Sequence, residues 1–146
     1  MIAMAYWLLK SEPHAWSWDQ QKKEGSKGAE WDGVRNFQAR NNMRKMKKGD
    51  LAFFYHSGDD KAVVGIVKIV KEAHPDSTDA TGQWECVDVA AVRALPSPVT
   101  LIEIKAKPSL KSMILARVPR LSVQPVTEAE WSTLCAMGGL TDPPRA

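Results

Sequence analysis

The pattern of apolar and polar residues divides the chain into short segments whose periods predict both strands and helices. Strands are predicted at residues 6–10, 51–56, 62–70, 84–92 and 121–123, where aromatic and β-branched residues alternate with polar ones or form short apolar runs. The segment 62–70 is nearly continuous in apolar residues and is therefore expected to be buried on both faces. Strands interleaved irregularly with short helices favour an α+β domain whose sheet curls into a barrel-like core.

Capping residues mark where the helices begin. Ser17 followed by Gln20 forms a capping-box pattern, and Gly25 is expected to end the helix that it opens. A second capping box, Thr127 with Glu130, opens the last predicted helix. Between these helices, three prolines are expected to bracket short helical pieces: Pro96, Pro98 and Pro108.

The segment from Arg35 to Lys48 carries basic residues and no acidic ones. With Asn36 as the helix N-cap, the helical period gives one apolar face and one basic face. The apolar face holds Ala39, Met43 and Met46, and the basic face holds Arg40, Arg44 and Lys47. Such a face attracts phosphates, and Trp31 beside the helix start offers a base a surface for stacking. The alternative is an ordinary solvated helix with Trp31 packed in the core.

Composition limits the class of protein. The 146 residues are 44% apolar and 25% charged, which is typical of one folded domain spanning residues 1–146. The net charge of +3 is small, so the basic character is local. The first apolar segment is too short and too soon charged for a signal peptide or a membrane span. Cys86 and Cys135 fall in different kinds of element and are not expected to pair, so a reduced, cytoplasmic protein is the simplest expectation.

The sequence offers little catalytic chemistry. It has no glycine-rich phosphate loop, and its histidines and cysteines lack the local spacing of a zinc deaminase, so we expect neither a metal nor a cofactor. Asp76, Glu103 and Lys105 loosely match a metal-dependent nuclease; the alternative is a surface turn at Asp76 and solvated side chains elsewhere. An enzyme acting on nucleic acid therefore stays an alternative, beside a protein-interaction module that uses surplus tryptophans as an exposed patch.

Six blocks along the chain together resemble the EVE domain family: residues 6–13, 31–36, 38–42, 53–57, 98–101 and 120–126. The blocks occur in order and span nearly the whole chain. The resemblance implies a PUA-like fold, in which a bent, barrel-like β sheet is surrounded by short helices. It also implies a binding pocket for a nucleotide base, with modified cytosines such as 5-methylcytosine and 5-hydroxymethylcytosine in DNA as ligands.

A pocket that reads an extruded base needs aromatic walls and polar groups at the base edge. The aromatic candidates are Trp7, Trp31, Phe54 and Tyr55, and the polar candidates are Ser11, Asn36, His56, Ser57, Arg120 and Ser122. Phosphates would be met by Lys10, Arg35, Arg40, Arg44 and Lys47. For each aromatic candidate the alternative is core packing; for Asn36 it is helix capping, and for His56 a structural role. The sequence thus predicts a non-enzymatic, monomeric module that binds DNA or RNA carrying a modified base.

Overall fold

The computed structural model describes residues 5–146, and its six strands form one mixed sheet in the order β2-β5-β4-β3-β1-β6. The strands are β1 (Tyr6–Ser11), β2 (Ala29–Glu30), β3 (Leu51–His56), β4 (Ala62–Pro75), β5 (Glu85–Thr100) and β6 (Val123–Val126). The strand β1 runs parallel to β3, and every other neighbouring pair is antiparallel. The first four predicted strands are present, the fifth lies at Val123–Val126 and shares only Val123 with the predicted residues 121–123, and the two-residue β2 was not predicted.

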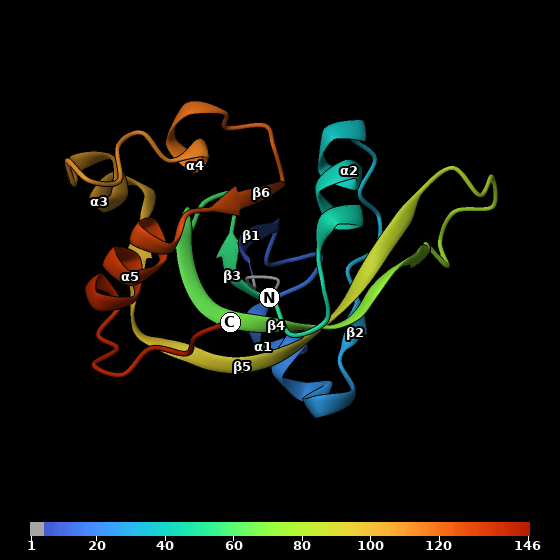
Figure 1. The fold of residues 1–146 in the computed structure, drawn as a ribbon, viewed down its shortest axis with the longest axis horizontal. Coiled ribbons are helices and arrows are strands. Elements are labelled where there is room, and N and C mark those ends of the chain that lie inside the picture. The colour runs from blue at the N-terminus through green and yellow to red at the C-terminus, as the bar shows by residue number, and fades with distance from the viewer. Residues whose placement is uncertain (1–4) are drawn as a thin grey trace.

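The long strands β4 and β5 bend the sheet into a barrel-like form (Figure 1). Their pairing shifts register at several points, and such bulges bend a strand and increase its twist. At one shift the register passes from Ala94 opposite Gly65 to Val99 opposite Val63, so Pro96 and Pro98 lie in a bulge of β5. A bulge needs no ladder hydrogen bond from a proline nitrogen, so both prolines fit within the strand. The predicted short helix is present at Leu101–Ala106, between Pro98 and Pro108.

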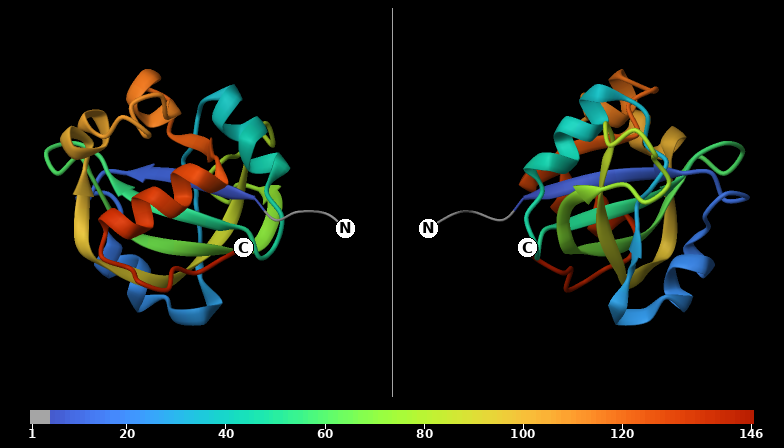
Figure 2. Two further views of the ribbon diagram at one scale, coloured as in Figure 1. Left: turned by 60° about the vertical axis from the view of Figure 1, so that its left-hand side comes forward. Right: turned by 90° about the vertical axis from the view of Figure 1, so that its right-hand side faces the viewer.

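Helices surround the sheet, as the predicted α+β class requires. They are α1 (Trp18–Lys23), α2 (Phe37–Lys45), α3 (Leu101–Ala106), α4 (Ile114–Arg117) and α5 (Glu128–Met137), with a 3-10 turn η1 (Gly25–Lys27) after α1. The capping boxes expected for α1 and α5 are both formed, and Asn36 caps α2. In Figures 1 and 2, α3, α4 and α5 lie together on one side of the sheet and α2 lies on the other. Within residues 5–146, no helix is long and apolar enough to cross a membrane.

Alternation along the central strands separates two hydrophobic cores. On β3, Phe53 and Tyr55 belong to one core, whereas Phe54 belongs to the other. The first core also contains Trp131 of α5, and the second contains Met43 of α2. Neighbours on a strand face opposite ways, so each core takes every second residue. The segment 62–70 is largely buried as expected, with residues in both cores.

The tryptophans serve mainly in packing. Four of the six are buried and two are half-buried: Trp7, Trp18, Trp31 and Trp131 are buried, and Trp16 and Trp84 are partly exposed. The interaction-module alternative assumed an exposed patch of surplus tryptophans, and this premise is wrong. Cys86 and Cys135 are both free and buried, as expected.

Candidate functional site

A cavity of about 690 Å³ opens beside the start of α2, between β1, the connection from β2 to α2 and the loop that joins β4 to β5. The side chains around it are mixed, with aromatic walls and charged groups at the rim. The lining residues are Lys10, Ser11, Glu12, Ala15, Trp16, Ala29, Glu30, Trp31, Asp32, Gly33, Val34, Arg35, Ser77 and Ser122. The cavity therefore draws together chain segments far apart in the sequence.

Trp31 forms a fixed wall of this cavity. Only 6% of the residue is exposed, and its ring meets Phe54 edge-to-face with centroids 5.3 Å apart. Its backbone N–H donates to the Val87 carbonyl at 2.8 Å, which holds the start of the connection to α2 against β5. Trp31 thus lines the cavity while its ring is packed against the core.

Trp16 lines the cavity as a second aromatic wall, and the sequence analysis did not select it. The indole Nε1–H of Trp16 donates to Gln21 Oε1 at 2.9 Å. The amide of Gln21, which is buried, donates in turn to the Val89 carbonyl at 3.0 Å. This chain of hydrogen bonds fixes the ring before any ligand arrives. Trp16 was missed because its position before the Ser17 capping box indicated only a helix start.

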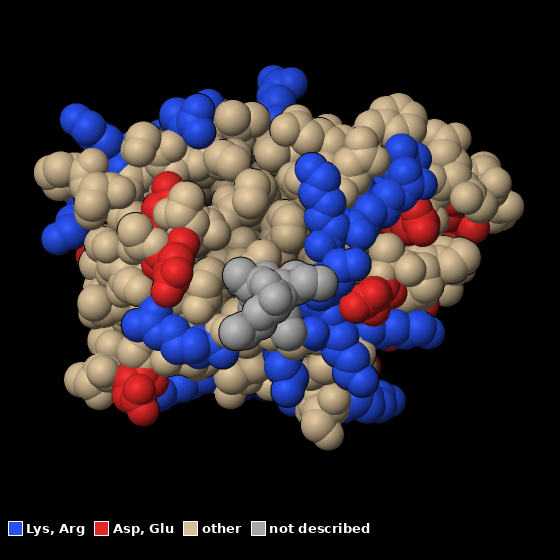
Figure 3. Space-filling view, in the orientation of Figure 1, with Lys and Arg blue, Asp and Glu red and all other residues tan. Residues whose placement is uncertain are grey.

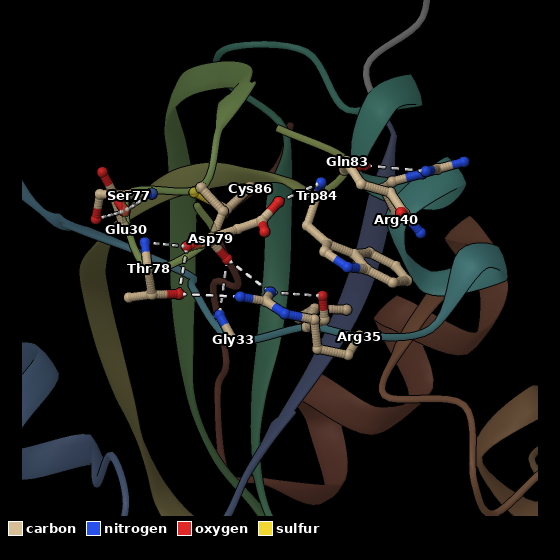
Figure 4. Close-up of polar contacts among 12 residues, drawn as sticks. Glu30, Gly33, Arg35, Arg40, Ser77, Thr78, Asp79, Gln83, Trp84 and Cys86 are labelled. Atoms are coloured by element: carbon tan, nitrogen blue, oxygen red, sulfur yellow. Dashed lines mark hydrogen bonds and ion pairs between the residues drawn. The ribbon is translucent and has the colours of Figure 1, made fainter. Parts of the chain in front are cut away.

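Asp76 ties the connection between β2 and α2 to the β4–β5 loop. Its Oδ2 accepts hydrogen bonds from the Gly33 backbone at 2.9 Å and from Arg35 Nη1 at 3.1 Å, and Thr78 donates to Oδ1 (Figure 4). Burial alone would raise the pKa of Asp76, but the hydrogen bonds from Thr78, Gly33 and Arg35 outweigh it and lower that pKa to about 2. The expected turn is present, since the Asp79 N–H donates to the Asp76 carbonyl at 3.0 Å, but the Asp76 side chain is buried and acts as a clamp at the cavity rim.

Three carboxylates line the cavity itself: Glu12, Glu30 and Asp32. Glu30 Oε1 accepts from the Ser77 hydroxyl at 2.7 Å, and this bond lowers the pKa of Glu30 (Figure 4). Partial burial and the neighbouring carboxylates of Asp76 and Glu30 raise the pKa of Asp32. The exposed Asp32 side chain offers hydrogen-bond acceptors at the cavity mouth.

Lys10, Ser11 and Ser122 line the β1 side of the cavity. Lys10 Nζ donates to the Pro119 carbonyl at 2.7 Å, and burial lowers the pKa of its ammonium group. The Ser11 hydroxyl donates to the Trp16 carbonyl at 2.7 Å, so its oxygen is left as an acceptor. The structure therefore brings together five of the predicted site residues: Lys10, Ser11, Trp31, Arg35 and Ser122.

The other predicted aromatic residues do not line the cavity. Trp7 is buried and donates from Nε1 to Asp50 at 3.0 Å. Phe54 is fully buried behind Trp31, and Tyr55 packs in the opposite core. Their side chains pack in the two cores, so the core-packing alternative holds for these three residues.

The remaining polar candidates also lie outside the cavity. Asn36 accepts from the Ala39 N–H as the cap of α2. His56 Nε2 accepts from the Trp18 N–H at 3.0 Å and its Nδ1 faces Asp60, so His56 fixes the start of α1. Ser57 lines a separate acidic hollow, and Arg120 is exposed elsewhere.

Basic side chains gather over α2 on the face shown in Figure 3. Arg40 lies over the rings of Phe37 and Trp84, which stack with centroids 4.9 Å apart. Arg44 pairs with Glu85, whereas Lys47 is exposed and forms no ion pair within residues 5–146. Ala39, Met43 and Met46 are buried, as the predicted helix face requires.

The Phe37–Trp84 stack is a flat aromatic surface that sequence reasoning did not find. Phe37 is 56% exposed, and Trp84 is held by a hydrogen bond from its N–H to Asp79 at 2.8 Å. The Arg35 guanidinium lies 5.7 Å from the Trp84 ring and also lines the cavity, so the stack adjoins the cavity rim. The two rings lie 47 positions apart in the sequence, and only the folded β4–β5 loop brings them together.

The candidate catalytic groups already have structural partners. Glu103 accepts from the Thr100 N–H and hydroxyl in the capping box of α3. Burial raises the pKa of Cys135 to about 11 and also raises the pKa of Cys86, so neither thiol is poised as a nucleophile. A group of possible metal ligands, Glu30, His74, Cys86 and Asp88, does come together beside the cavity.

Comparisons with known proteins agree on one family. The profile described as "EVE domain" matches residues 5–137. Thymocyte nuclear protein 1 of Gallus gallus is 38% identical over 168 residues, which cover 93% of this chain and 69% of that protein. The crystal structure of protein Atu2648 from Agrobacterium tumefaciens matches with a TM-score of 0.94 and 56% identity, covering 97% of this chain and 98% of that chain. Human THYN1 in complex with 5-methylcytosine-containing DNA matches with a TM-score of 0.86 and 34% identity, over 95% and 99% of the two chains.

Proposed function

Because the chain belongs to the EVE domain family, we propose that it binds nucleic acid and takes one extruded, modified cytosine between Trp16 and Trp31. The observation that carries this proposal is a cavity with two pre-oriented indole walls and polar groups at its rim. The complex of human THYN1 with DNA containing 5-methylcytosine, a protein of the same fold, supports the choice of ligand.

The energetics favour such a pocket. Extruding a base costs a few kcal/mol of unstacking, and stacking on aromatic side chains returns about 1–3 kcal/mol per base. The Trp16 ring is held by a hydrogen bond and the Trp31 ring by its packing against Phe54, so little side-chain entropy is lost when a base enters. A buried methyl group adds about 0.8 kcal/mol, so the methyl preference is expected to be roughly fourfold unless a polar contact adds to it.

The cavity rim supplies the polar contacts. In our proposal the Asp32 carboxylate accepts a hydrogen bond from the cytosine amino group, a pairing that suits carboxylates and cytosine. Lys10 and Ser122 lie on the β1 side of the cavity, where they meet the carbonyl edge of the base or the phosphate beside it. The exact division of these roles depends on how the base is oriented.

The surface outside the cavity suits the rest of the strand. The exposed Phe37 ring stacked on Trp84 offers a platform for a neighbouring base, and Arg40 lies over both rings. Lys47 extends the basic surface beyond the end of α2. Such contacts position the strand without reading its sequence.

We further propose that the protein binds without turnover, as a monomer. The carboxylates of Asp76 and Glu103, which the nuclease alternative requires on a metal, are each engaged by hydrogen bonds in separate parts of the fold. The free, buried cysteines support a reducing compartment, and the cytoplasm is the location we propose.

Substitution of Trp16 tests the proposal. We expect Trp16→Ala to weaken binding to an oligonucleotide with one 5-methylcytosine by roughly tenfold to a hundredfold, the equivalent of about 1–3 kcal/mol of stacking. Trp16→Phe keeps an aromatic face and should retain most of the affinity. Fluorescence anisotropy gives the affinities, and circular dichroism checks that each variant is folded. A folded Trp16→Ala protein that binds like the wild type would contradict the proposal.

A further inference from the structure

Four potential metal ligands converge beside the cavity wall, on three adjacent strands of the sheet. Glu30, His74, Cys86 and Asp88 each contribute one ligand atom, and these atoms all lie within 4.8 Å of one another. The register explains the convergence, because Glu30 pairs with Asp88 across β2 and β5, and His74 pairs with Cys86 across β4 and β5. Side chains two residues apart on a strand share a face, so Cys86 and Asp88 point to the same side of β5.

The imidazole of His74 has the orientation that a metal ligand needs. Its Nδ1 lies 3.1 Å from the Pro75 carbonyl oxygen, which can only accept, and its Nε2 faces the group. In the tautomer with the proton on Nδ1, the lone pair of Nε2 is free to bind a metal ion. This Nε2 lies 2.7 Å from Asp88 Oδ1 and 3.9 Å from Cys86 Sγ. Without a metal ion this contact is a hydrogen bond, and a metal ion would take the place of the proton between the two atoms.

Hydrogen bonds outside the group orient its members. Glu30 Oε1 accepts from the hydroxyl of Ser77 at 2.7 Å and from its N–H at 3.3 Å. The backbone carbonyl of Pro75 orients His74 in the same way. Metal-binding histidines and carboxylates typically have such outer partners, which fix the ligand geometry. Cys86 is fully buried, and the side chains of His74 and Asp88 are 17% and 22% exposed.

We propose that Glu30, His74, Cys86 and Asp88 form a binding site for one transition-metal ion, and that Zn²⁺ is the ion that fits best. One thiolate, one imidazole and two carboxylates are ligand types that Zn²⁺ accepts, and four protein ligands are typical of a closed, structural zinc site. Loading releases the thiol proton of Cys86 and the proton shared by His74 and Asp88. Because Zn–N and Zn–O bonds are about 2.0–2.2 Å long, the Asp88 carboxylate must also move away from His74 by roughly half an ångström.

The ion would fasten β2 to the hairpin formed by β4 and β5. Glu30 also lines the cavity, so a bound ion fixes the position of that wall. The site does not depend on nucleic-acid binding and can be tested without an oligonucleotide. Local sequence motifs gave no sign of it, since its ligands come from three strands and include no paired Cys-x-x-Cys.

Titration of the chelator-treated protein with Co²⁺ tests the site, because a cobalt–thiolate bond gives a charge-transfer absorption that other ligands do not. We expect one equivalent of Co²⁺ to bind with this absorption, Zn²⁺ to displace it, and the melting temperature to rise with Zn²⁺ concentration. Binding of less than one equivalent, or binding without the thiolate absorption, would overturn the proposal.

Two cysteine variants form a matched pair. Cys86→Ser should abolish the charge-transfer absorption, whereas Cys135→Ser, which removes the other buried thiol, should leave it unchanged. If Cys86→Ser does not fold, Asp88→Asn takes its place, and we expect it to weaken Co²⁺ binding by at least tenfold. Unchanged affinity in Asp88→Asn, or a retained absorption in folded Cys86→Ser, contradicts the assignment.

Discussion

In the proposed pocket, Asp32 is the residue on which the choice of base depends most directly. Its exposed carboxylate lies at the cavity mouth, beside the clamp formed by Asp76, and it accepts hydrogen bonds without donating when ionised. Cytosine presents an amino group on its pairing edge, where thymine presents a carbonyl oxygen. A carboxylate at this position therefore favours cytosine and repels thymine.

Removal of this carboxylate should relax the base preference. We expect Asp32→Ala to reduce the preference for 5-methylcytosine over thymine by about 1–3 kcal/mol, which is roughly tenfold to a hundredfold in the affinity ratio. Asp19→Ala removes an exposed carboxylate on α1 that does not line the cavity, and serves as the control. Competition binding with two oligonucleotides that differ at one base measures the ratio. An unchanged ratio in Asp32→Ala would assign the edge contact to another residue.

The clamp at Asp76 makes stability depend on pH. The pKa of this carboxyl is lowered in the folded protein from 3.8 to about 2, so its stabilisation is complete above the unfolded value and is lost as the pH falls through the folded value. The contribution is on the order of 2 kcal/mol at neutral pH. We expect Asp76→Asn to lose this contribution. Its unfolding free energy should therefore fall less steeply than that of the wild type between about pH 4 and pH 2.

Denaturant unfolding at a series of pH values checks this expectation. Asp59→Asn alters an exposed carboxylate at the edge of another hollow and should retain the wild-type decline. A decline in Asp76→Asn as steep as in the wild type would show that the clamp contributes little.

Some of the residues that line the cavity could be predicted from the sequence, and others could not. Trp31 and Arg35 were found because they stand beside a marked helix start, and Lys10 and Ser11 because they lie in a block that resembles the EVE family. By contrast, Glu30 and Ser77 are brought to the cavity by strand pairing and by a loop, for which one sequence gives no contact information. The same polar residue types also occur in binding cavities and in helix caps, so the sequence alone does not separate the two roles. Asn36, a predicted site residue, is a helix cap.

At the scale of elements, the position of α1 depends on the absence of a side chain on β4. A Cβ atom at Gly65 would lie 2.5 Å from the ring of Trp18, the first residue of α1. The Trp18 ring in turn packs edge-to-face against Phe54, which lies behind Trp31 of the cavity wall. The close contact between α1 and β4 thus supports the cavity from behind.

Substitution at Gly65 tests this contact. We expect Gly65→Ala to destabilise the protein by about 1–3 kcal/mol, because the added methyl group overpacks a full core. The double variant Gly65→Ala with Trp18→Phe lacks the ring atoms that clash with the added methyl group. Its loss of unfolding free energy should therefore be smaller than the sum of the losses in the two single variants. Strict additivity in denaturant unfolding would show that the methyl group is accommodated elsewhere.

Elements with strong local signals were predicted well, and those set by tertiary pairing were not. The caps at Ser17, Asn36 and Thr127 each fix a helix start through contacts within four residues, so they are visible in the sequence. The pairing of β2 with β5 and the bulge at Pro96 depend on distant strands. The ends of β4 and β5 therefore lie beyond the predicted segments.

In the proposed complex, the cavity binds the base and the basic face of α2 binds the phosphates. The net charge of +3 is too small for a general attraction to nucleic acid, so phosphate contacts depend on the local cluster over α2 (Figure 3). Contacts with phosphates are weakened by salt, whereas stacking within a cavity is screened little. Affinity and base preference should therefore respond differently to ionic strength.

The proposed pocket can be tested on the wild-type protein alone, by measuring over a series of salt concentrations its affinity for two oligonucleotides that differ only in one 5-methylcytosine. We expect the affinity for both to fall with salt, with a log–log slope of about −0.7 to −0.9 for each phosphate neutralised. The ratio of the two affinities should favour the methylated strand and stay nearly constant. The absence of binding at low salt, or equal affinity for the two strands at every salt concentration, would contradict a pocket that reads a modified base.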